Sequence, residues 1–170
     1  GMAILIFIIG LAIFGAHEWY ADKPWRFKSL VDREVVKIAF DNPEALTSLG
    51  FLDGMGITGH NAKLNDNSLA KEDALFATIR SVHKQINAYD DSELSEQDLL
   101  SKQIANFLIG DIENIEQFRF HNYPVNQLFG VQSNYPSFMD AQHQISDLES
   151  AQNYVARLRQ TGFKFDNVLS

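Results

Sequence analysis

The chain opens with an unbroken apolar run, and its later apolar residues recur at helical spacing. Residues 2–16 read MAILIFIIGLAIFGA and carry no charged or polar side chain. As a helix they span about 22 Å, which is short of the roughly 30 Å hydrocarbon core of a bilayer. Trp19 and Tyr20 extend the run with aromatic side chains that suit a membrane interface. The pattern favours a signal-anchor-like helix over residues 1–20, with a cleaved signal peptide and a buried core helix as the alternatives.

After this segment, the spacing of apolar residues predicts an all-α fold, an irregular bundle of about six to seven helices with an apolar N-terminal helix. Gly50 and Gly162 are typical helix stops, Pro136 bounds an irregular segment, and residues 163–170 indicate the entry into a further helix. We therefore expect residues 21–170 to form one helical domain, the truncated N-terminal part of a longer protein. The predicted helices cover residues 27–41, 43–49, 69–89, 95–120, 137–143 and 151–160.

Composition narrows the classes of partner. The 170 residues hold 14 Lys and Arg against 22 Asp and Glu, a formal net charge of -8. This balance argues against a nucleic-acid partner, because such proteins present a basic face. The chain has no cysteine, so disulfides, cysteine zinc sites and thiol nucleophiles are excluded. We expect two partners through Met2–Tyr20 instead: the membrane in the cell, and further copies of the chain in a homo-oligomer when the protein is crystallised.

The same segment predicts where the protein is located. We expect it at the periplasmic face of the inner membrane, or exported and membrane-anchored. Lys23, Arg26 and Lys28 follow the apolar run and, taken alone, would hold the following chain on the cytoplasmic side. No Lys or Arg precedes the run, so the charged region usual before such a helix is missing or was lost upstream, and this charge signal is given little weight because the native start is not fixed.

No short motif specifies a nucleotide site or a serine nucleophile. Residues 54–59 read GMGITG and match the dinucleotide pattern G-x-G-x-x-G. The mechanism of that pattern needs a strand before it and a helix N-terminus after it, which are not predicted here, so we interpret it as a flexible turn. No serine lies in a Gly-x-Ser-x-Gly elbow.

Metal-ligand patterns are equally incomplete. His17 and Glu18 begin a zinc-peptidase-like motif whose second histidine is absent. A di-metal centre in a helical bundle requires two Glu-x-x-His elements and two further carboxylates. The chain offers only paired residues on shared helix faces, so we assign it no catalytic residue, no metal ligand and no cofactor. These pairs are Asp140 with His143 and Glu113 with Glu116.

An ordered series of stretches resembles a known family. A helical stretch at residues 27–33 is followed by NPEALTSLG at residues 42–50. YPVNQLFGVQ then covers residues 123–132, followed by His143 and by YVARL at residues 154–158. The series resembles the N-terminal portion of the bacterial family catalogued as domain of unknown function 885 (DUF885). The resemblance covers nearly the whole chain after about residue 17.

The resemblance implies a function for the larger protein. Members of the family are much longer, usually exported or attached as lipoproteins, and resemble all-α zinc metallopeptidases. Their metal motif, of His-Glu-x-x-Pro-Gly-His kind, lies later in the chain, and no segment here matches it. The resemblance therefore implies an exported, non-catalytic N-terminal fragment of a metallopeptidase-like protein. The alternative is a self-associating interaction module in which the apolar N-terminal helix mediates oligomerisation.

Within such a fragment, a few polar residues are candidates for one wall of a substrate cleft. They lie in or near the stretches that carry the resemblance, beside prolines that bound an irregular segment. The other interpretation is that they satisfy buried backbone groups in that segment. The candidates are Asn126, Gln127, Gln132 and His143.

Overall fold

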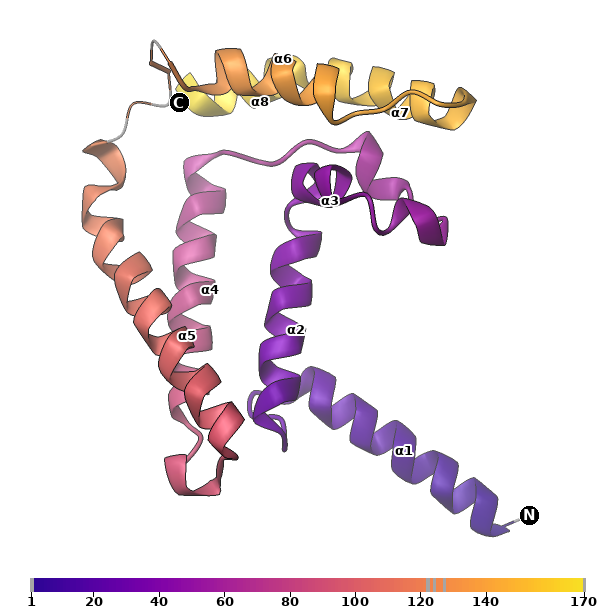
Figure 1. Cartoon of the computed structure of the whole chain (residues 1–170), viewed down its shortest axis with the longest axis vertical. Helices are drawn as coiled ribbons and strands as arrows, with labels where there is room; N and C mark the ends of the chain where they lie inside the picture. Colours follow the sequence, from indigo (N-terminus) through magenta and orange to yellow (C-terminus); the bar gives the residue numbers. More distant parts are fainter. Residues whose placement is uncertain (1, 122, 124, 127, 170) are drawn as a thin grey trace. The chain divides into compact units, whose positions relative to one another are not determined.

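The computed structural model describes residues 2–121, 123, 125–126 and 128–169, with side chains from Ile4 to Val168 in those ranges. Every regular element in this part of the chain is a helix (Figure 1), so the prediction of an all-α fold is confirmed. The helices in chain order are α1 (Met2–Tyr20), α2 (Phe27–Phe40), α3 (Pro43–Leu49), η1 (Asp53–Met55), η2 (Gly59–Ala62), α4 (Leu69–Asn87), η3 (Asp91–Glu93), α5 (Glu96–Ile115), η4 (Glu116–His121), α6 (Val131–Ala141), α7 (Leu148–Arg159) and α8 (Thr161–Leu169), where η marks a short 3-10 helix.

The chain divides into two compact units. Unit 1 contains Gly1–Val36 and Phe76–Gln117, and unit 2 contains Lys37–Leu75 and Phe118–Ser170. Each unit is therefore built from two separate stretches of sequence. The stretch that completes unit 1 lies between the two stretches of unit 2.

Unit 1 packs its helices around a small aromatic and aliphatic core. Phe27 and Leu30 on α2 are buried against Ile86 of α4 and against Tyr89, which follows that helix. The Phe27 and Tyr89 rings meet edge to face with their centroids 5.3 Å apart, a favourable geometry for aromatic rings. The Tyr89 hydroxyl donates a hydrogen bond of 2.7 Å to the Pro24 carbonyl, and burial raises the pKa of Tyr89 to about 12.

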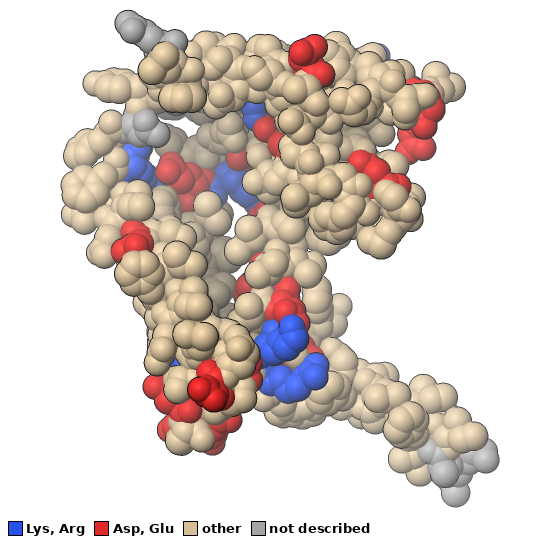
Figure 2. Space-filling view, viewed as in Figure 1, with Lys and Arg blue, Asp and Glu red and all other residues tan. Residues whose placement is uncertain are grey.

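An acidic surface covers the turn between α4 and α5. Figure 2 shows Asp and Glu side chains gathered there. Lys102, which is buried, anchors the turn by donating to the Tyr89 carbonyl at 2.7 Å and to the Asp91 carboxylate at 2.6 Å. The following helix begins as predicted, with the Ser95 hydroxyl accepting from the Asp98 N–H.

The apolar stripe of α5 is exposed. Ala105 and Ile109 pack against the core of unit 1, while Phe107 is 68% exposed. Apolar spacing thus identifies the helix correctly, but it does not show which apolar face is buried. The exposed members of the stripe are Leu100, Ile104, Phe107, Leu108, Ile112 and Ile115.

Unit 2 contains a second core built on one face of α6. Val131, Tyr135 and Met139 recur at a spacing of four and are buried together. The helix begins at Val131, so the prediction that it covers residues 137–143 is wrong, and Pro136 lies inside it. Pro136 has no N–H, so one helix carbonyl lacks its usual donor. Because Pro136 is on the exposed face, that carbonyl can bond to water instead. Packing of the apolar stripe therefore outweighs the proline.

The last two helices also depart from their predicted ends. Asp147 caps α7 by accepting from the Ser150 N–H, and Ser150 returns the bond in a capping box, so the helix begins at Leu148. Gly162 is not a stop but lies within α8. Only a left-handed φ makes glycine a helix terminator, and Gly162 does not have one.

Both predicted ends of α3 are confirmed. The Asn42 side chain accepts a hydrogen bond of 3.0 Å from the Ala45 N–H, and Pro43 occupies the first turn. Gly50 ends the helix in the left-handed region, at φ 65°. These ends fix the orientation of Thr47, which the site described below requires.

The apolar N-terminal run forms α1, in unit 1. Its side chains from Ile4 to Ile13 are exposed, and Figure 2 shows this helix without Lys, Arg, Asp or Glu along most of its length. In the part of the chain that is described, no helix has the combined length and hydrophobicity required to cross a membrane.

Candidate functional site

The centre of unit 2 is a fully buried arginine that bonds only to neutral groups among the described residues. Arg157 is 0% exposed. A buried charge is costly unless its N–H donors are hydrogen-bonded. Arg157 therefore depends on well-placed neutral acceptors rather than on a carboxylate partner. Its hydrogen bonds run from Nε to the Lys63 carbonyl (2.8 Å), from Nη1 to His143 Nδ1 (2.7 Å), and from Nη2 to Thr47 Oγ1 (2.6 Å), the His60 carbonyl (3.2 Å) and the Pro43 carbonyl (3.5 Å).

Local structure brings these acceptors to the guanidinium. The single hydroxyl proton of Thr47 is shared between two acceptors, the Pro43 carbonyl one turn earlier on α3 at 3.0 Å and Asn61 Oδ1 at 2.7 Å. Its oxygen is thus free to accept from Arg157. Arg157 lies in the last turn of α7, where a positive charge is favoured by the helix dipole. Burial lowers the pKa of Arg157 to about 10, which leaves it charged at neutral pH.

Arg157 determines the tautomer of His143. A guanidinium can only donate, so His143 Nδ1 must be the unprotonated acceptor. The proton is then on Nε2, which donates to the Ser150 carbonyl at 3.1 Å. Burial lowers the pKa of His143, which agrees with a neutral ring. Both ring nitrogens are occupied, so His143 has no lone pair left for a metal or a proton.

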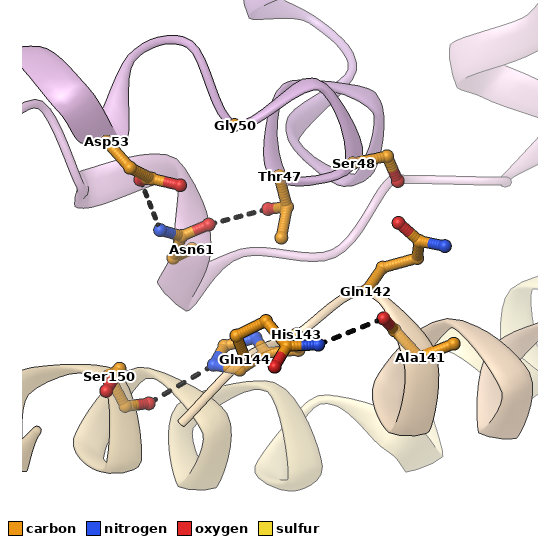
Figure 3. A pocket seen from close by; sticks show the side chains of 10 residues that line it. All are labelled: Thr47, Ser48, Gly50, Asp53, Asn61, Ala141, Gln142, His143, Gln144 and Ser150. Atoms are coloured by element: carbon orange, nitrogen blue, oxygen red, sulfur yellow. Dashed lines mark hydrogen bonds between the residues drawn. The ribbon is translucent and has the colours of Figure 1, made fainter. Parts of the chain in front are cut away.

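A polar pocket of about 310 Å³ lies beside this arginine, entirely within unit 2. Figure 3 shows Asn61 held between two neighbours, with its amide donating to Asp53 and its oxygen accepting from Thr47. Both hydrogen bonds are 2.7 Å. The pocket is lined by Thr47, Ser48, Gly50, Asp53 and Asn61 on one side and by Ala141, Gln142, His143, Gln144 and Ser150 on the other.

His60 adds a second buried imidazole next to the pocket. It is 8% exposed, and its Nε2 lies 3.6 Å from Asp53 Oδ1. Burial lowers the pKa of His60 more than the Asp53 charge raises it. Arg157 therefore lies between two histidines that are neutral at pH 7.

The predicted cleft residues are not brought together. His143 lines the pocket, whereas Asn126 and Gln132 form a separate turn in which Gln132 donates to the Asn126 carbonyl at 2.6 Å. The Asn126 side chain accepts from the Phe129 N–H at 2.6 Å, so it satisfies local backbone. Gln127 lies outside the described residues.

Two of the carboxylates considered as metal ligands, Glu113 and Glu116, have other partners in unit 1. Glu113 contacts His83 Nδ1 at 3.1 Å, and Glu116 accepts from Arg80 at 2.6 Å. Asp140 is exposed on α6. Among the residues that the structure describes, no group of three or more His, Cys, Asp or Glu side chains lies where it could hold a metal ion.

Sequence reasoning missed the centre of this site. Arg157 belongs to the stretch 154–158 that carries the family resemblance, yet nothing in its spacing shows that it is buried. Thr47 likewise belongs to the stretch 42–50. Asp53 and Asn61 flank the GMGITG run at residues 54–59, which was considered only as a nucleotide-binding pattern. In the structure this run forms part of η1, the left-handed end of η1 at Gly56, and the start of η2. The resemblance was the one signal that pointed to this region.

Comparison with known proteins places the chain in a family. A family model described as "Bacterial protein of unknown function (DUF885)" matches residues 43–170, which is well over half of the chain. The chain belongs to this family. The DUF885 match begins at the first residue of α3, so Arg157 and every acceptor that it binds lie inside it. No curated protein and no solved structure matches the chain.

Proposed function

We propose that this DUF885 chain is an exported, membrane-tethered helical domain that has no catalytic centre of its own and forms part of a metallopeptidase-like protein. The observation that carries the tether is the surface of α1. Four consecutive residues, Ile4 to Phe7, are 58–67% exposed. Because consecutive residues point to different sides of a helix, the apolar surface extends around the whole circumference. Such a helix is stable when lipid or protein surrounds it.

The end of α1 and the residues that follow it have the composition of a membrane interface. Trp19, Tyr20 and Trp25 are 43%, 82% and 59% exposed. The side chains of Arg26 and Lys28 are 65% and 73% exposed. Aromatic rings and cations with apolar stems favour the headgroup region. This combination supports a position of the α1 end at the lipid headgroups.

Buried charges attach α1 to the body of unit 1. Arg33, which is 3% exposed, donates to the Trp19 and Ala21 carbonyls at 3.2 and 2.6 Å and so caps the end of the helix. Glu18 accepts from the Trp25 N–H at 3.1 Å, and His17 stacks on the Trp25 ring with centroids 3.8 Å apart. These contacts fix the end of α1 to the rest of unit 1, so α1 is not joined to it by a flexible linker.

The state of His143 supports the absence of a catalytic centre. This imidazole is the titratable ring that lines the pocket, and both of its nitrogens are engaged. General base catalysis and metal binding each need a free lone pair. The polar groups around Arg157 therefore fit a structural centre better than a reactive one.

A vesicle flotation experiment tests the tether. We expect the full chain to float with phospholipid vesicles and Ile8→Lys to lose most of this partition, because a charged lysine among hydrocarbon chains is costly, by an amount that reaches about 2.5–3.5 kcal/mol at the bilayer centre. Phe107→Lys is the matched control, since Phe107 is also exposed and apolar but lies on α5. Flotation that depends on Phe107 and not on Ile8 would overturn the proposal. A vesicle-independent oligomer lost in Ile8→Lys would instead support self-association through α1.

Export and catalysis need separate tests. A phosphatase that is active only outside the cytoplasm, fused after residue 170, should be active in cells. The purified chain with zinc should leave a peptide library intact, and chelator-sensitive turnover would contradict the non-catalytic assignment. The reading frame after the codon for Ser170 should encode a His-Glu-x-x-Pro-Gly-His-like motif if the chain is part of a metallopeptidase-like protein.

A further inference from the structure

We propose that the pocket between α3, the η1–η2 segment and residues 141–150 binds a small, neutral, polyhydroxylated ligand such as a sugar or a sugar alcohol. This inference is independent of the tether, because all residues of the pocket belong to unit 2 and α1 belongs to unit 1. The volume of about 310 Å³ equals about ten water molecules, which suits a ligand of monosaccharide size.

The charges around the pocket favour a neutral ligand. Asp53 is the charged side chain in its lining, and Arg157 lies buried behind Thr47 with the opposite sign. His143 is neutral for the reason given above. The Asp53 carboxylate repels an anion, and the positive charge of the buried Arg157 offsets part of the attraction that Asp53 exerts on a cation, so a neutral ligand is favoured.

The pairing of Asp53 with Asn61 favours hydroxyl groups. The Asn61 amide uses one N–H on Asp53, which leaves a second N–H, and the Asp53 carboxylate retains acceptor capacity. A donor and an acceptor thus stand side by side. A single hydroxyl can accept from one and donate to the other, whereas an amide must use two atoms for the same task.

The opposite wall of the pocket offers a second adjacent hydrogen-bond donor and acceptor. Figure 3 shows the Gln142 carboxamide pointing toward Ser48 across the pocket. Gln142 is exposed, and no hydrogen bond of its side chain occurs within the described residues. Its oxygen and its amide are both available to a ligand. No Phe, Tyr or Trp side chain lines the described pocket, so recognition would depend on hydrogen bonds rather than on stacking against such a ring.

The floor of the pocket is rigid before any ligand binds. Arg157 holds Thr47, Thr47 holds Asn61, and Asn61 holds Asp53, with hydrogen bonds of 2.6, 2.7 and 2.7 Å. Ligand binding would therefore cost little free energy for ordering these side chains. The buried arginine, which forms no part of the lining, acts as a positioning residue for the site.

Side-chain amide NMR of the full chain tests the proposal. The protein is held in phosphocholine micelles, because detergents with sugar headgroups would compete. Glucose, galactose and sorbitol are titrated, with N-methylacetamide, acetate and a tetramethylammonium salt as the other arms. We expect at least one polyol to shift the Asn61 and Gln142 amide resonances in a saturable manner. Shifts by the amide or by either ion, but by no polyol, would overturn the ligand class.

Variants localise the binding. Gln142→Ala should weaken the polyol affinity about three- to tenfold, as expected for the loss of one or two hydrogen bonds. This variant removes an exposed side chain that has no hydrogen-bond partner among the residues the structure describes, so the fold should be unaffected. Gln152→Ala, at an exposed position of α7 outside the pocket, is the matched control and should bind as the unmodified chain does. Equal affinity for both variants, or no saturable polyol shift at all, would refute the proposal.

Discussion

Replacing Arg157 should disrupt unit 2 and leave unit 1 folded. Arg157→Ala deprives His143 Nδ1, Thr47 Oγ1 and the Lys63 carbonyl of their donor at distances of 2.6–2.8 Å. An unsatisfied buried polar group costs about 1–3 kcal/mol. Partial relaxation and entry of water offset some of this sum, so we expect a loss of about 3–5 kcal/mol, as for other broken buried charge networks. Unit 2 would lose much of a typical domain stability of about 5–15 kcal/mol.

The assay must separate the two units. The chain has 2 tryptophans, Trp19 and Trp25, and both lie in unit 1. Urea unfolding followed by tryptophan fluorescence therefore reports unit 1 alone and should not change. Hydrogen exchange read by mass spectrometry should show lost protection in α3, η2 and α7 of unit 2.

Two further variants make the result interpretable. Arg157→Met keeps most of the side-chain volume and leaves the same acceptors unsatisfied, so it should be nearly as destabilising as Arg157→Ala. This distinguishes lost hydrogen bonds from a cavity. Arg159→Ala removes an exposed arginine from the same turn of α7 and should change stability by no more than about 0.5 kcal/mol. If Arg157→Ala lies within about 1 kcal/mol of Arg159→Ala, the reasoning is wrong.

Three more predictions concern pH and the ends of helices. Because burial lowers the pKa of His143, its protonation favours the unfolded chain. Unit 2 should be fully stable above pH about 6.5 and lose stability as pH falls through the lowered value, and exchange protection that does not change between pH 7 and 5 would contradict this. Gly50→Ala should cost about 1 kcal/mol in chemical denaturation, because a Cβ at Gly50 meets nothing within 4 Å but φ is 65°. Gly54→Ala, equally open and without a positive φ, should not destabilise. Arg33→Ala should lower the tryptophan-detected stability of unit 1 by about 3 kcal/mol, because it uncaps α1 and leaves buried acceptors unpaired. Lys84→Ala, at an exposed position of α4, is the control, and equal unfolding midpoints for these two variants would refute the role of Arg33.

Local rules explain which parts of the fold could be predicted. Asn42, Gly50 and Ser95 end or begin helices through contacts within a few residues, so the sequence alone was sufficient for them. Pro136 and Gly162 were predicted to lie at helix ends but are inside α6 and α8, because tertiary packing of these helices outweighs a local preference for a helix end. The same limit explains why apolar spacing did not show which face of α5 is buried.

The site could not be predicted because it depends on long-range polar contacts. A buried arginine and an exposed arginine look alike in a sequence, and Arg157 differs from Arg159 only through groups on α3 and η2. His143 was named as a cleft candidate through the family resemblance. Its tautomer, and hence its structural role, follows from a neighbour that only the fold supplies.

The spacing of these contacts along the chain has a consequence for synthesis on the ribosome. Arg157 is 94 residues from Lys63 and 110 from Thr47. At about 5–20 residues per second, translation needs roughly 5 to 20 s to bridge the shorter interval. During that time the newly made α3 segment has no cation to bind, whereas everything needed for the tryptophan-bearing unit has been translated by Gln117. The nascent polypeptide thus acquires its two halves in sequence, and the later one is vulnerable to proteases until α7 emerges.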